Sequence, residues 1–275
     1  YQTLLREVGR TPKTVEAVRS MALLHGFYLD EKDTAVALLQ EAVKLGRNDQ
    51  KFVDKCKLDM GDIYLLKNEP WEATLIYSQV EKSAKDSPLG YDAKLRNARL
   101  SYFKGDFQLA QEHLDILKLA TSREIANDAM DLSILIQDNT GLDSTGAAMR
   151  DYAKVELLLF QNEDTKALAL LDDMLTRYAG HSLADEILWQ QAQVYTKRGE
   201  FEQAARRLEK IMTDYGYDIL ADDAEFTLAK LKEEKLGKKE EAMEMYKNFL
   251  VKHPGSIFVV EARKRYRNLR GDATQ

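Results

Sequence analysis

Apolar residues recur along this chain in a helical pattern that contains a small residue at one fixed position. Six segments carry an alanine followed four residues later by a larger apolar residue, as Ala73 is followed by Tyr77 and Ala204 by Leu208. In several of them another apolar residue comes three positions further on. Positions i, i+4 and i+7 lie on one face of an α-helix. Each segment is therefore predicted to be a helix with one buried face, where the alanine lets a second helix approach closely.

The six alanines are regularly spaced, with one exception. They are Ala35, Ala73, Ala110, Ala167, Ala204 and Ala242, and their separations are 38, 37, 57, 37 and 38 residues. An earlier helical pattern of about 14 residues precedes most of them and ends in a short turn such as Gly105-Asp106 or Gly199-Glu200. Self-similarity at a fixed period is typical of repeat proteins, and each copy predicts a pair of antiparallel helices.

These copies resemble the tetratricopeptide repeat, a helix–turn–helix unit of about 34 residues. Family positions are occupied by Gly61, Tyr64, Ala73, Tyr77 and Val80 in one copy, by Ala192, Tyr195, Gly199, Phe201, Ala204, Leu208 and Ile211 in another, and by Pro254 at the family's terminal proline. The resemblance implies an all-α fold, a right-handed superhelical α-solenoid of antiparallel helix pairs. We expect about 13 helices and no sheet.

The period is three or four residues longer than the common one, and two junctions place a serine, Ser182 or Ser256, where it could cap the next helix. This longer repeat is similar to bacterial cell-envelope repeat proteins linked to outer-membrane assembly. That similarity implies a bacterial protein of the periplasm or cell envelope. Because the chain starts at Tyr1, we expect a processed or excised piece of a larger protein.

The 57-residue separation predicts one extra helix near the middle of the chain. Helical patterns cover 123–137 and 147–161, and the stretch between them is rich in turn residues. Either the linker crosses back to restore helix direction, or Ser144 caps a helix that begins earlier and continues through Gln161. In both cases we predict an N-terminal sub-solenoid at 1–138, a linker at 139–146 and a C-terminal sub-solenoid at 147–275.

The end of the chain combines apolar residues with five cations, Arg263, Lys264, Arg265, Arg267 and Arg270. Such a cluster can bind nucleic acid or an anionic membrane. A solenoid also needs a terminal helix that covers its last repeat. The apolar positions Ile257, Phe258, Val260, Ala262, Tyr266 and Leu269 fit one face of such a helix. We favour a capping helix at about 256–270.

Composition and motifs argue against catalysis. The chain is 44% apolar and 31% charged, which indicates a folded protein. Its net charge of −6 indicates that it binds nucleic acid poorly. Four separated histidines and the single Cys56 give no metal-ligand spacing, and neither a phosphate-binding loop nor a nucleophile elbow is present. No apolar run is long enough to cross a bilayer. We expect no catalytic residue, cofactor or metal, and no direct membrane insertion.

The resemblance implies that the first helix of each pair lines a concave, partner-binding face. The residues expected there are Leu58, Leu95, Arg99, Phe103, Trp189, Gln193, Phe226 and Lys230. They depart from the Lys, Asn and Arg clamp by which some family members hold a peptide carboxylate. The apolar line favours an amphipathic helix or extended segment; for Trp189 and Phe226 the alternative is packing between helices. We expect weakly salt-dependent binding, with Trp189 contributing most.

The predicted function is a non-catalytic scaffold that binds another protein or peptide. Two alternatives stay open. The chain could be an envelope factor of the outer-membrane-assembly type, or the accessory domain of an enzyme whose catalytic part lies elsewhere in the parent protein.

Overall fold

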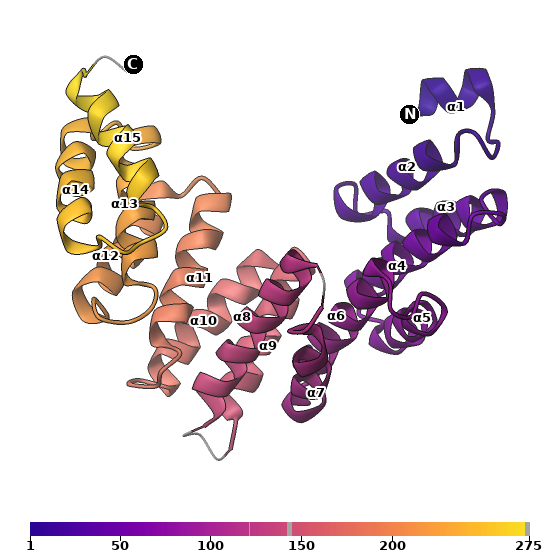
Figure 1. Cartoon of the computed structure of the whole chain (residues 1–275), viewed down its shortest axis with the longest axis horizontal. Coiled ribbons are helices and arrows are strands. Elements are labelled where there is room, and N and C mark those ends of the chain that lie inside the picture. Colours follow the sequence, from indigo (N-terminus) through magenta and orange to yellow (C-terminus); the bar gives the residue numbers. More distant parts are fainter. Residues whose placement is uncertain (121, 142–144, 273–275) are drawn as a thin grey trace. The chain divides into compact units, whose positions relative to one another are not determined.

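The computed structural model of the chain describes residues 1–120, 122–141 and 145–272. These residues form fifteen α-helices and no strand, and most helices pack on the next one along the chain (Figure 1). The predicted all-α fold of helix pairs is thereby confirmed. The helices outnumber the 13 or so that were expected, and the short α1 (Gln2–Val8), which carries no repeat pattern, is among the additions.

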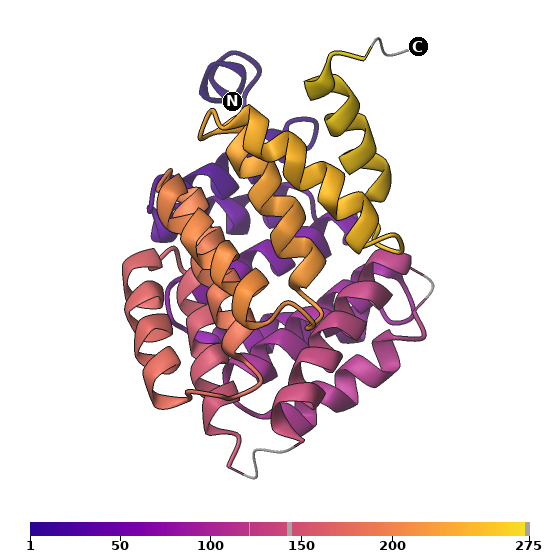
Figure 2. The same ribbon diagram turned by 90° about the vertical axis from the view of Figure 1, so that its left-hand side faces the viewer.

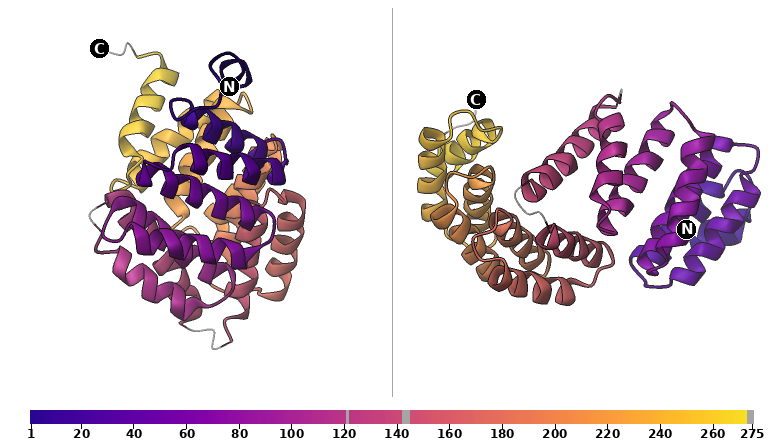
Figure 3. Two further views of the ribbon diagram at one scale, coloured as in Figure 1. Left: turned by 90° about the vertical axis from the view of Figure 1, so that its right-hand side faces the viewer. Right: turned by 90° about the horizontal axis from the view of Figure 1, so that it is seen from below.

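The chain divides into two compact units, Tyr1–Glu163 and Asp164–Gln275. In the first unit the hairpins are α2 (Val15–Phe27) with α3 (Lys32–Leu45), α4 (Gln50–Leu66) with α5 (Pro70–Ser83), and α6 (Pro88–Phe103) with α7 (Phe107–Leu117); α8 (Arg123–Thr140) and α9 (Ala147–Phe160) follow. The left view of Figure 3 shows this unit's purple helices in successive layers.

The second unit begins with α10 (Asp164–Arg177). Two hairpins follow, α11 (Ala184–Lys197) with α12 (Phe201–Asp214) and α13 (Ala221–Glu234) with α14 (Lys239–Lys252), and α15 (Val259–Arg270) ends the fold. In Figure 2 the yellow α15 runs beside α14.

The six alanines of the repeat pattern all lie in the interior of the fold. Each is fully buried, and the residues four and seven positions after each alanine are at most 1% exposed. These are Leu39 and Ala42, Tyr77 and Val80, Leu114 and Leu117, Leu171 and Met174, Leu208 and Ile211, and Tyr246 and Phe249. The predicted buried face is confirmed in every copy. Because alanine has only a methyl group, the facing helix can pack directly against the backbone.

A residue in the left-handed conformation precedes every one of these alanines. Five positions before each lies a residue with a φ between 57° and 76°: Asp30, Asn68, Gly105, Asn162, Gly199 and Gly237. Glycine, asparagine and aspartate are the residues that adopt this left-handed conformation at least cost. The next residue closes the preceding helix, as when the N–H of Glu69 donates to the carbonyl of Tyr64 at 2.9 Å. The repeat is therefore fixed by its turn as well as by its buried face.

The extra segment in the middle forms two separate helices, α8 and α9, so the alternative of one long helix that begins before Ser144 and continues through Gln161 is wrong. Residues 142–144, with Ser144, lie outside the described part of the chain. Helix α9 packs on α6 and α8, and the Gln161 side chain donates to the Leu65 carbonyl at 3.0 Å. These contacts place the division into compact units after Glu163. The repeat boundary at 139–146 stays a prediction.

Helix α15 covers the last hairpin as a cap would. Ala262 is fully buried, and Phe258, Val259, Tyr266 and Leu269 pack on the cluster of Phe226, Tyr246 and Phe249. Ile257 and Val260, which were expected on this face, are 87% and 77% exposed. The helix begins only at Val259, and its packed face runs through positions 258, 262, 266 and 269, so Val260 points to the opposite side.

Candidate binding site

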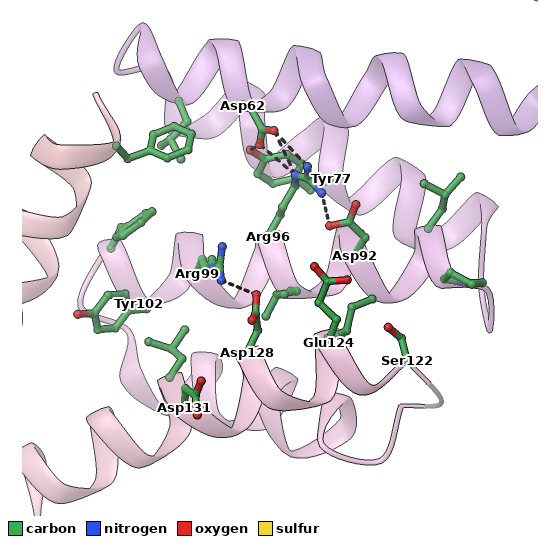
Figure 4. A pocket seen from close by; sticks show the side chains of 18 of the residues that line it. Asp62, Tyr77, Asp92, Arg96, Arg99, Tyr102, Ser122, Glu124, Asp128 and Asp131 are labelled. Carbon is green, nitrogen blue, oxygen red and sulfur yellow. Dashed lines mark hydrogen bonds and ion pairs between the residues drawn. The ribbon is translucent and has the colours of Figure 1, made fainter. Parts of the chain in front are cut away.

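A groove of about 1000 Å³ lies on the first unit, over helix α6. Helices α4 and α8 form its two walls, because each packs on α6 (Figure 4). Helix α9 contributes Glu156 and Phe160 to the lining. We call it the α6 groove. Helices α4, α6 and α8 point the same way along the chain, since antiparallel helices alternate. The carboxyl ends of all three therefore lie together at one end of the groove.

That carboxyl end is mostly apolar, although Tyr102 and Glu156 also line it. It is lined by Leu65, Phe103, Leu132, Leu135 and Phe160. Phe160 also packs against the cores of the first two hairpin layers, so α9 is anchored where it closes this end. None of these five side chains carries a polar group, so they can hold a partner only by burying apolar surface.

The middle of the groove is occupied by a closed polar network. The hydroxyl of Tyr77 donates to Asp62 at 2.7 Å, and Arg96 donates to the same carboxylate through Nε at 3.0 Å. Arg96 also pairs with Asp92, one turn before it on α6. Burial alone would lower the pKa of Arg96, but Asp62 and Asp92 raise it, so the guanidinium stays charged. Burial and the Asp62 carboxylate raise the pKa of Tyr77.

A second ion pair joins the floor of the groove to one wall. Arg99 Nη2 on α6 lies 2.9 Å from Asp128 Oδ2 on α8, and both groups are half-exposed. Figure 4 shows Glu124 and Asp128 pointing from α8 toward the groove. Glu124, Asp128 and Asp131 follow the i, i+4, i+7 spacing of one helix face. Both arginines of the groove are thus already paired with carboxylates.

The residues predicted to bind a partner separate into two groups in the structure. Leu95, Arg99 and Phe103 come together in the α6 groove. Leu58 does not reach it: it is 2% exposed, in the core between α4, α5 and α6 with Ala73 and Tyr77. Leu58 therefore presents almost no surface to a partner.

The other four residues belong to the second unit. Phe226 is 3% exposed and stacks on Phe258 with ring centroids 4.6 Å apart, which is the packing alternative raised for it. Trp189 is half-buried against the core of α11 to α13, and Gln193 is exposed. The Lys230 ammonium lies 5.9 Å from the Phe226 ring centroid. A binding role for these residues stays a prediction.

Sequence reasoning missed the network around Arg96 and the carboxylates of α8. Asp62 and Arg96 are 34 residues apart, and only the fold brings them together. The i, i+4, i+7 spacing of Glu124, Asp128 and Asp131 was the signal that could have indicated the acidic wall.

A second hollow, of about 1280 Å³, lies on the other side of α6, between α5 and α7. Trp71 lies here, 78% exposed, with the Lys104 ammonium 4.5 Å from its ring centroid. Ile116 is 53% exposed at the same surface. Burial lowers the pKa of His113, which also lines this hollow. We call this surface the back groove.

The described residues offer little to metal or thiol chemistry. They hold no group of three or more His, Cys, Asp or Glu side chains that could share a metal ion. Cys56 is fully buried, and burial raises the pKa of its thiol to about 12. Within the described ranges, no helix combines the length and the apolar character that a membrane crossing requires.

Comparison with known proteins identifies the repeats. The model of the tetratricopeptide-repeat family matches residues 186–216 and 223–256, which cover the hairpins α11–α12 and α13–α14. The chain is thus a helical-hairpin repeat protein, and the resemblance to the tetratricopeptide-repeat family is confirmed. No curated protein matches the chain.

Three solved structures are similar at low identity. The tetratricopeptide-repeat domain of P58(IPK) is 14% identical with a TM-score of 0.37, covering 94% of this chain and 66% of that one. Naa15/Naa10 bound to HypK-THB is 17% identical with a TM-score of 0.38, covering 99% and 36%. PilF of Pseudomonas aeruginosa is 12% identical with a TM-score of 0.35, covering 96% and 99%. The chain thus spans about two thirds and one third of the first two.

Proposed function

We propose that this chain is a non-catalytic scaffold that binds a segment of another protein in the α6 groove. The observation that carries the proposal is the apolar end of the groove, where Leu132, Leu135 and Phe103 line an open hollow. Such a concave apolar surface with a few polar groups beside it is the usual form of a binding site. Tetratricopeptide repeats serve as protein-interaction scaffolds, which supports the same assignment.

The proposal also explains the rigid middle of the groove. The network of Tyr77, Asp62 and Arg96 joins α4, α5 and α6 by charged hydrogen bonds. Charge-assisted hydrogen bonds are stronger than neutral ones and hold their partners in one geometry. The groove is therefore formed before a partner arrives, which reduces the entropy lost on binding.

Two finer hypotheses concern the parent protein. We propose a bacterial envelope location, in line with the longer repeat period, or an accessory role beside a catalytic domain outside this chain. The full-length sequence separates them: a lipoprotein or secretion signal supports the first, and a catalytic domain supports the second.

Selection from a displayed peptide library tests the binding site without a known partner. Random peptides of about twelve residues are selected on the immobilised chain, and the enriched peptides are titrated against variants. The paired substitution Leu132→Ser and Leu135→Ser removes the apolar wall of α8 and should weaken binding at least ~10-fold, the equivalent of ~1.4 kcal/mol. Ile116→Ser makes the same chemical change in the back groove and should leave binding unchanged.

Two results would contradict the proposal. The first is binding that survives the loss of Leu132 and Leu135 in a variant whose circular dichroism is unaltered. The second is binding lost with Trp189→Ala alone, which would move the site to the second unit.

A further inference from the structure

The charges that line the α6 groove fall into two classes, paired and open. Arg96 is held by Asp62 and Asp92, and Arg99 is held by Asp128. On the α8 wall, Glu124 and Asp131 are exposed and make no hydrogen bond or ion pair with other described residues. The cations without such a pair, Lys51 and Lys55, lie in the first turns of α4, on the opposite wall.

From this division we infer that the groove selects a basic segment: an apolar anchor with two Lys or Arg side chains beside it on the α8 side. The inference rests on the proposed function and adds the chemistry of the partner. The anchor fills the apolar end at Leu132 and Leu135, and the cations pair with Asp131 and Glu124. Only the α8 wall attracts the partner's positive charges, because the arginines of α6 are already paired with carboxylates.

An acidic segment fits this surface poorly. To pair with Arg96 or Arg99 it would have to displace Asp62, Asp92 or Asp128, and the displaced carboxylates would then face the incoming negative charge. Like charges brought together in an interface reduce affinity strongly. The paired guanidinium groups therefore attract a new anion less than free ones would. The open cations, Lys51 and Lys55, lie near the start of α4, at the other end of the groove from its apolar carboxyl end.

The spacing of the two open carboxylates sets the spacing of the partner's cations. Glu124 and Asp131 are seven residues apart on one helix face, which corresponds to about 10 Å along the axis of α8. An extended segment rises about 3.3 Å per residue, so its two cations would be three positions apart. A helical segment would place them seven positions apart. In either form the anchor lies next to the cation that faces Asp131, because Leu132 and Leu135 continue the wall beyond it.

The peptide selection described above provides the test when three further proteins are added. Glu124→Gln with Asp131→Asn removes the open carboxylates. Lys51→Gln with Lys55→Gln is the matched control, since it removes two open charges from the opposite wall. Glu124→Lys with Asp131→Lys reverses the sign of the α8 wall.

We expect wild-type selection to enrich peptides with two Lys or Arg residues beside an apolar one. Removing both carboxylates should weaken a selected peptide about 5- to 10-fold at low salt, as two exposed ion pairs would. This difference should shrink at high salt, where exposed charges are screened. The lysine control should bind such a peptide no more weakly than wild type, and the reversed wall should select acidic peptides instead.

The results that would overturn the inference differ from those that would overturn the proposed function. Peptides that need Leu132 and Leu135, but are not basic and do not respond to loss of the carboxylates, disprove the partner's charge and leave the groove as the site. Peptides that bind independently of Leu132 and Leu135, or no enrichment at all, disprove the groove and the inference together. Circular dichroism of each variant confirms that the fold is kept.

Discussion

Replacing Gly61 by alanine should destabilise the first unit, although alanine is the better helix former. Gly61 lies inside α4, where the side chain of Tyr77 crosses from α5. A Cβ atom at this position would lie 2.3 Å from Cε1 and 2.8 Å from Cδ1 of the tyrosine ring. The ring cannot turn aside freely, because it is 1% exposed and its hydroxyl donates to Asp62.

Two unfavourable contributions and one favourable contribution set the size of this loss in stability. Carbon atoms rest at ~3.5–4.0 Å, so the ring would have to move by about 1 Å or more. Overpacking of this kind costs ~1–3 kcal/mol. A displaced hydroxyl would also weaken a hydrogen bond to a charged acceptor, which is worth ~1.5–3 kcal/mol. Alanine in place of glycine inside a helix returns ~1 kcal/mol. The expected net loss is therefore about 2 kcal/mol.

Urea unfolding followed by circular dichroism at 222 nm measures this loss. Gly255→Ala is the control, because nothing lies within 4 Å of its Cβ position, and it should change stability by less than ~0.5 kcal/mol. Combining Gly61→Ala with Tyr77→Leu should cost less than the sum of the two single changes, since the smaller side chain leaves room for the methyl group.

A Gly61→Ala protein that is as stable as the parent, or more stable, would refute this reasoning. Helix propensity would then outweigh the contact, and the Tyr77 ring would not be fixed against α4.

Three further predictions test other parts of the structure. Ala73→Leu and Ala204→Leu should each cost ~1–3 kcal/mol in urea unfolding, because both alanines are fully buried between helices; unchanged unfolding midpoints would contradict the repeat register. Removing residues 257–275 should expose Phe226, Tyr246 and Phe249 and raise light scattering, whereas a truncated protein that remains monomeric would show that α15 is dispensable. Burial lowers the pKa of His113 from 6.5, so the unfolded chain binds the proton first and stability should fall as pH drops below about 6.5; His113→Gln should reduce this fall in unfolding titrations.

The helices could be predicted from the sequence because their signals are local. Ala73, Tyr77 and Val80 lie within two turns of one helix, so their spacing alone shows that they share a face. Pro70 marks the start of that helix, and the structure places it in the first turn. The serine at 182 was less informative. Helix α11 starts two residues later, and the His181 ring nitrogen, not the serine, accepts the N–H of Leu183 at 3.1 Å.

The groove could be predicted only in part, because its composition depends on contacts between distant residues. The repeat register pointed to Leu95, Arg99 and Phe103, which line the α6 groove, although Leu95 is only 6% exposed. The same register also pointed to Leu58 and Phe226, which neighbouring helices cover. An apolar residue on the first helix of a hairpin can face a partner or pack against the next hairpin. Which of the two occurs depends on the neighbouring helices, and the spacing of residues in the sequence does not reveal these neighbours.

The pairing of Arg99 with Asp128 illustrates the same limit for charge. Arg99 reads from the sequence as an available cation, yet a carboxylate 29 residues later neutralises it. The charge that the groove presents to a partner therefore depends on the packing of α8 beside α6, which the sequence does not show.

The shared turn before each key alanine has a consequence for how such a chain can grow. A residue with a φ near 57–76° stands five positions before the alanine in all six copies. In four of them, the turns at Asn68, Gly105, Asn162 and Gly199, the N–H of the next residue donates to the carbonyl five residues back, so these four turns share one backbone geometry. A crossover between the gene segments for two turns would therefore produce a seamless junction. Recombination from Asn68 to Gly105, for example, would delete or duplicate one unit of 37 residues without creating a new loop. Recombination at these turns can therefore change the number of repeats while each remaining helix is still joined to its neighbour by a turn of the same kind.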